Sequence, residues 1–171
     1  MRQSLTLLVL MLLAAMLGGC NPHYNWRDYR STDAPYTVLF PAKPATHTRA
    51  VQLGAVTVNM TMTAAEVDDV VFAVGSAELA DAAQAPAALQ AMQTALAHNI
   101  GASITAHAVA ATDRQTTVSV EARGMRQGQP ALLIGRFIAR DKRIYQVIVM
   151  GAERHIVREH AETFLQSFKP T

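Results

Sequence analysis

The hydrophobic pattern of the chain changes its period several times, and each change predicts an element. Between residues 55 and 63 apolar and polar side chains alternate, which is the period of a strand with one buried face. Comparable short runs predict strands over residues 36–40, 46–53, 69–79, 104–111, 116–122, 131–140 and 144–150. Helical spacing replaces this pattern over 86–99 and again from Val157 to Phe168. The order of strands, helix, strands and closing helix predicts an α+β domain.

Two late segments, 131–139 and 144–150, are apolar on both faces. Strands of this kind need cover on both sides of the sheet. We therefore expect a central, mostly antiparallel sheet of about six to seven strands, flanked by helices as an α/β/α sandwich. The closing helix should cover one face through a single apolar stripe, formed by Val157, Ala161, Phe164, Leu165 and Phe168.

The N-terminus has the pattern of a signal peptide, predicted over residues 1–19. The uncharged run from Leu5 to Leu17 follows Arg2 and is shorter than the roughly 20 residues that cross a bilayer. The next residues, Leu17-Gly18-Gly19-Cys20, resemble the lipobox of bacterial lipoproteins. This resemblance implies that a signal peptidase recognises Leu17, Gly18 and Gly19 and that lipid is attached to Cys20. Because Cys20 is the only cysteine, no internal disulfide can form.

The residues after Cys20 predict where the protein is held. Asn21 stands where an Asp would tend to retain a lipoprotein in the inner membrane. We therefore expect a lipid-anchored protein of the bacterial envelope, on the outer membrane and facing the periplasm. The polar, proline-containing residues 20–35 are predicted to be a lipidated tether, and 36–171 a single globular domain.

Three short stretches carry a second resemblance. They are Tyr36-Thr-Val-Leu-Phe-Pro-Ala-Lys-Pro44, the Gly128-Gln-Pro-Ala131 turn that leads to Arg143-Ile-Tyr145, and Phe164-Leu-Gln-Ser-Phe168. Together they resemble the PsbP/Mog/DcrB-like fold of small envelope lipoproteins and of extrinsic photosynthetic proteins. The resemblance covers most of residues 36–168 and implies a fold, since members of this group share no active site.

Charge is distributed unevenly along the chain. Residues 31–113 hold two basic and seven acidic side chains, whereas 114–171 hold ten basic and five acidic. Arg136 and Arg140 should share one strand face, and Arg143 should return beside them after a tight turn at Asp141-Lys142. Two interpretations stay open: a solvated rim that protects a sheet edge, or a contact patch for anionic lipid headgroups or an acidic protein. The overall near-neutral charge gives no reason to expect nucleic acid as a partner.

The sequence shows no catalytic pattern. Its six histidines form no metal-ligand array, so we predict no metal site and no cofactor. Ser76 lies within a predicted strand and lacks the glycine pattern of a nucleophile elbow, and Asp68-Asp69 is more typical of a solvated turn. We expect a non-enzymatic domain that binds a partner or supports the envelope. The alternatives are a small-ligand carrier and a hydrolase or metal-dependent envelope enzyme.

Overall fold

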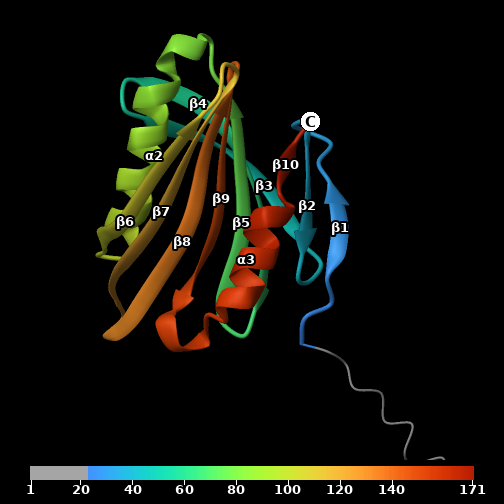
Figure 1. The fold of residues 1–171 in the computed structure, drawn as a ribbon, viewed down its shortest axis with the longest axis vertical. Coiled ribbons are helices and arrows are strands. Elements are labelled where there is room, and N and C mark those ends of the chain that lie inside the picture. Colours follow the sequence, from blue (N-terminus) through green and yellow to red (C-terminus); the bar gives the residue numbers. More distant parts are fainter. Residues whose placement is uncertain (1–22) are drawn as a thin grey trace, which may run out of the picture.

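The fold is built around one antiparallel sheet of seven strands (Figure 1). In this computed structural model the described residues are 23–171, so the predicted signal peptide and Cys20 lie outside them. The strand order is β3-β4-β5-β9-β8-β7-β6. The bounds are Ala45–Leu53 (β3), Val56–Val67 (β4), Val70–Glu78 (β5), Ser103–Ala111 (β6), Gln115–Arg126 (β7), Gln129–Arg140 (β8) and Arg143–Ala152 (β9). The predicted α+β class and strand number are confirmed.

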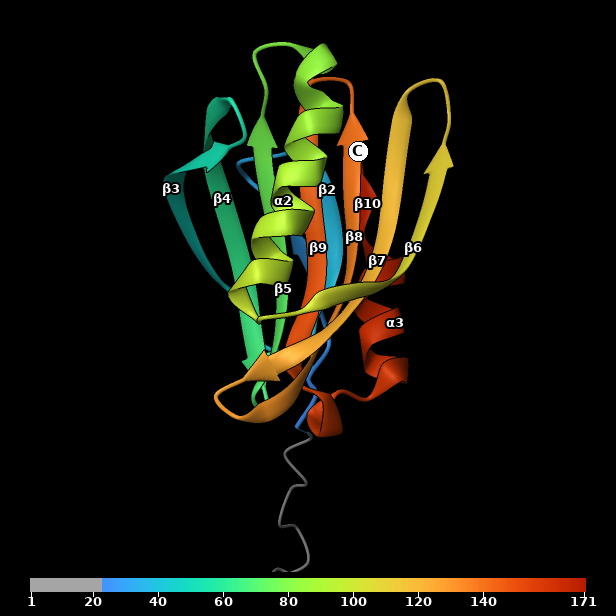
Figure 2. The same ribbon diagram turned by 90° about the vertical axis from the view of Figure 1, so that its left-hand side faces the viewer.

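One face of the sheet is covered by helix α2, Ala85–Asn99, which follows the short 3₁₀ turn η2, Ala82–Gln84 (Figures 1 and 2). Pro86 stands in its first turn, where the missing N–H costs nothing. Leu89 and Met92 point to the sheet and pack with Phe137 and Ile148 in an apolar layer. The helix therefore rests mainly on the central strands β8 and β9.

The opposite face has a mixed cover of one helix and a second sheet. Helix α3, Arg158–Ser167, follows the 3₁₀ turn η3, Glu153–His155. Beside it lies a three-stranded antiparallel sheet of β1 (Arg27–Arg30), β2 (Tyr36–Phe40) and β10 (Lys169–Pro170) (Figure 1). The expected sandwich is present, but its first predicted strand belongs to this smaller sheet rather than to the central one.

An aromatic cluster joins this second layer to the main sheet. Phe164 is fully buried, with its ring centroid 5.4 Å from that of Phe40 and 5.5 Å from that of Phe72. Of the stripe predicted for the closing helix, Ala161, Phe164 and Leu165 lie in the helix and are buried, as expected. Val157 was wrongly included, because it precedes the helix in an extended conformation and is 50% exposed.

Part of the expected tether is packed onto the domain. β1 pairs with β2, and the rings of Tyr24 and His160 lie with their centroids 3.9 Å apart. Trp26 meets Phe72 edge to face at 6.2 Å. The packed structure therefore begins before residue 36, and Trp26 and Tyr29 pack on the domain, as their aromatic character predicts.

Candidate functional site

The predicted lipidation motif, Leu17 to Cys20, lies outside the described residues, and lipid attachment stays a prediction. The described chain begins beside the turn between β4 and β5. There the His23 Nδ1 lies 2.9 Å from the Asp68 carboxylate. This end of the sheet is therefore the one from which the chain continues toward Cys20.

The three predicted patch arginines share one face of the sheet, as expected. Arg140 and Arg143 are cross-strand partners, and Arg136 is four residues earlier on β8. Each has a partner within the described chain. Arg136 donates to the Leu165 carbonyl at 3.0 Å, Arg140 to the Pro170 carbonyl at 2.8 Å, and Arg143 to Glu78 at 2.7 Å. Two of the three therefore hold the C-terminal segment, which the sequence did not predict.

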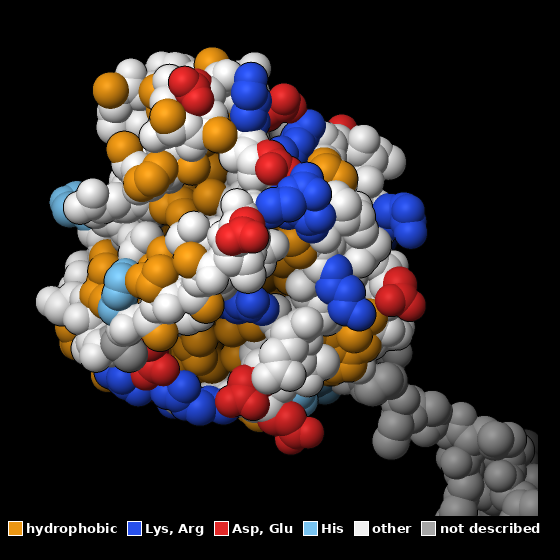
Figure 3. Space-filling model, turned by 45° about the horizontal axis from the view of Figure 1, so that its top comes forward, with side chains coloured by type: hydrophobic (Ala, Val, Ile, Leu, Met, Phe, Trp, Pro, Cys, Tyr) orange, Lys and Arg blue, Asp and Glu red, His pale blue; other side chains and the backbone are white. Residues whose placement is uncertain are grey.

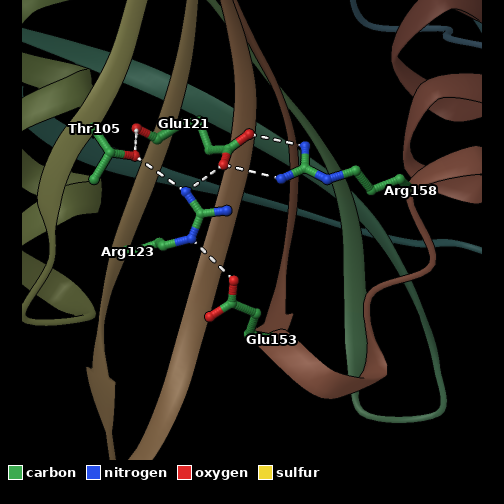
Figure 4. A network of polar contacts seen from close by, with 5 residues as sticks. All are labelled: Thr105, Glu121, Arg123, Glu153 and Arg158. Carbon is green, nitrogen blue, oxygen red and sulfur yellow. Dashed lines mark hydrogen bonds and ion pairs between the residues drawn. The ribbon is translucent and has the colours of Figure 1, made fainter.

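A second charged cluster lies where η3 and the start of α3 approach β7 (Figure 4). Arg158 donates to both carboxylate oxygens of Glu121, at 2.9 and 3.0 Å. Arg123 lies between Glu121, at 2.6 Å, and Glu153, at 2.9 Å. The hydrogen bonds from Arg158, together with the positive charges of both arginines, lower the pKa of Glu121, although burial opposes this shift. We interpret the cluster as a structural clamp, because its charges pair with one another.

Ser76 and Asp68-Asp69, also singled out from the sequence, lie in different surroundings. Ser76 is buried in the middle of β5, and Asp68 and Asp69 form an exposed turn with positive φ at both residues. Within residues 23–171, no three His, Cys, Asp or Glu side chains come together as a metal site. No helix in this part of the chain is both long and apolar enough to span a bilayer.

The architecture can be compared with known proteins. No family model matches the sequence, and no curated protein matches it. Among solved structures, the solution structure of cyanobacterial PsbP (CyanoP) from Synechocystis sp. PCC 6803 aligns with a TM-score of 0.56 and 16% identity. The alignment covers 90% of this chain and 96% of CyanoP. The fold is PsbP-like. A Pseudomonas aeruginosa protein of unknown function, PA94, a putative regulator, aligns over 80% of this chain and 89% of its own, with 14% identity and a TM-score of 0.39.

In this PsbP-like fold, the hairpin of β6 and β7 extends beyond the helix that covers its side of the sheet (Figure 2). Ile104 and Val109 on β6 are 43% and 59% exposed. A hollow of about 460 Å³ lies between α2 and this hairpin, and another of about 500 Å³ lies between the hairpin and α3. Hydrophobic side chains line recessed parts of this surface (Figure 3). The sequence predicted the strands but not their exposure, because exposure depends on where α2 and α3 end.

Proposed function

We propose that this protein is an envelope lipoprotein, anchored by lipid on Cys20, whose domain is a non-enzymatic binding module. The observation that carries the binding function is the exposed strand β6 at one edge of the central sheet. Ile104 and Val109 are exposed on this strand, and Ile104 borders the hollow beside α2, so apolar side chains of a partner could be accommodated there.

The position of two of the patch arginines argues against their contact with the anchoring membrane. Arg140 and Arg143 lie on either side of the β8–β9 turn, and Arg143 is opposite Glu78, the last residue of β5. The Asp68-Asp69 turn adjoins the other end of β5. The nine residues of β5 separate these ends by about 30 Å. A membrane held close to His23 would therefore lie far from this pair.

The alternative function is the carriage of a small ligand. The hollow beside α2 has a volume in the range of small-molecule sites, and its lining includes Leu89, Val118 and Ala139. A carrier should retain a ligand of low mass when it is purified from its own membrane, which native mass spectrometry would detect. A binding module for protein should show the mass of the lipidated chain alone.

Anchoring is tested by replacing Cys20 with Ser. We expect the wild-type protein to carry diacylglyceryl on Cys20 and to sediment with membranes, and Cys20→Ser to leave an unlipidated precursor. Mass spectrometry of both proteins from a host with the lipidation enzymes makes the comparison. Mature wild-type protein with an unmodified Cys20 would contradict the proposal.

The binding surface is tested by site-specific photo-crosslinking in living cells. A photoreactive residue at Val109 should give a discrete protein adduct, whereas one at Val157, 50% exposed beside α3, should not. Equal adducts at both positions, or none at Val109, would contradict binding through the hairpin.

A further inference from the structure

The outer edge of β6 differs from the opposite edge of the same sheet. β6 ends the strand order on one side and β3 on the other. The nine residues of β6 include no Lys, Arg, Asp, Glu or Pro, whereas β3 carries Arg49. Natural sheets protect exposed edges with charges, prolines or bulges. β6 has one such device, a register shift between Ile104 and Ala106, and from there to Ala111 its pairing with β7 is regular.

Each face of this edge borders a hollow. On the side of α2, the hollow is lined by Leu89, Gln93, Ile104 and Val118, and it contains no Lys, Arg, Asp or Glu. This hollow can accept apolar side chains without the cost of burying a charge. His107 borders this hollow and also the one beside α3.

The hollow beside α3 has a different chemistry. Its lining combines the charged side chains of Glu121, Arg136 and Glu162 with apolar ones such as Ile134 and Leu165. Ala108, Ser119 and Arg136 form one cross-strand row, and the two small side chains leave the hollow open toward the edge. Because charges of both signs lie beside apolar side chains there, uncharged side chains that can both donate a hydrogen bond and pack, such as Thr or Gln, suit this side.

From these two faces we propose that β6 accepts an extended segment of another protein as an added strand. The segment is amphipathic: alternate side chains are apolar and face α2, and those between them are polar and face α3. Its backbone would pair with the free edge of β6 and supply much of the affinity, while the two hollows select side chains. This inference rests on the proposed binding function and names its partner as an extended, uncharged strand.

The test uses a display library of random peptides, long enough to span the nine residues of β6, selected on the purified full-length protein. We expect the enriched peptides to alternate apolar and polar residues. On binding, they should shift the NMR signals of β6 and protect its amides from hydrogen exchange, while leaving β3 unchanged.

A matched pair of substitutions locates the site. Ala108 on β6 and Ala50 on β3 are both exposed alanines on edge strands of one sheet. Ala108→Lys should weaken the selected peptides by about tenfold or more, and Ala50→Lys by less than about twofold. If Ala108→Lys does not fold, Val109→Lys replaces it, because that side chain is 59% exposed.

Four results would overturn the proposal. They are the absence of enriched peptides, equal losses in both variants, shifts confined to β3, and a dimer of the protein itself that Ala108→Lys dissociates. The last would assign the edge to a second copy of this chain. Peptides that bind elsewhere would leave the proposed binding function intact while removing β6 as its site.

Discussion

At the scale of residues, the second layer depends on a few aromatic side chains. Phe164 lies between Phe40 and Phe72 and has no exposed surface. Phe164→Ala should lower the free energy of unfolding by about 3–5 kcal/mol, because it leaves a cavity in a packed cluster. Val157→Ala, at a half-exposed site, should change it by less than about 0.5 kcal/mol. Denaturant melts measure both changes. Similar midpoints for the two variants would mean that the aromatic cluster around Phe164 does not stabilise the second layer.

A single carboxylate should give the fold part of its acid sensitivity. The pKa of Glu121 is lowered in the folded protein, mainly by hydrogen bonds from Arg158, so its ionised form favours folding. This contribution is complete above the ordinary pKa of 4.5 and is lost as the pH falls through the lower folded value. Arg158 is 54% exposed, so solvent limits the effect to under about 1 kcal/mol.

Glu121→Gln should therefore reduce stability at neutral pH and lose less stability on acidification than the wild type. Denaturant melts at about pH 7 and about pH 3 measure the difference. Glu162→Gln is the control, because Glu162 forms no ion pair within residues 23–171. If Glu121→Gln has the same pH dependence as the wild type, the ion pairs of Glu121 are too exposed to solvent to contribute to the free energy of unfolding.

At the scale of elements, one close approach fixes how α2 connects to β6. The chain leaves α2 through residues 100–102 and crosses directly over Gly124 of β7. A Cβ at Gly124 would lie 2.6 Å from the Ala102 Cα and 2.6 Å from the carbonyl oxygens of Ile100 and Gly101. These are backbone atoms, which cannot rotate away as a side chain could.

Gly124→Ala should therefore destabilise the domain by about 1–3 kcal/mol. Ser119→Ala, at an exposed position of the same strand, should change stability by less than about 0.5 kcal/mol. Thermal unfolding of the two variants gives the comparison. Equal stabilities of the two variants would mean that residues 100–102 can move away from position 124 without a loss in the free energy of unfolding.

At the scale of the whole molecule, the boundary of the domain is the main difference from expectation. A chain beginning at residue 36 contains every element of the central sheet, and its independent folding stays a prediction. The structure adds β1 and the partly buried rings of Tyr24 and Trp26 to the packed layer.

A chain beginning at Asp33 should therefore fold but be less stable than one beginning at His23. We expect a loss of about 2 kcal/mol, from partly buried aromatic surface and the pairing of β1 with β2. Cooperative denaturant melts of the two chains measure it. Equal midpoints would mean that residues 23–32 add no stability and act as a tether. Aggregation of the shorter chain would mean that these residues are needed for folding.

The sequence by itself determined the local elements and the motif that predicts the anchor. Alternating and helical periods depend on neighbouring residues, so they predicted the seven central strands and both helices within a few positions. The lipobox resemblance likewise depends on four adjacent residues, Leu17 to Cys20.

Only the tertiary structure decided which surfaces are covered. β5 pairs with β9, with Val70 opposite Gly151, and this pairing places two hairpins on opposite sides of the centre. α2 and α3 rest mainly near that centre, which leaves most of the edge strand β6 exposed. The exposure of Ile104 and Val109 follows from contacts between segments far apart in the chain, because an apolar residue in a strand has the same local pattern whether a helix reaches it or not.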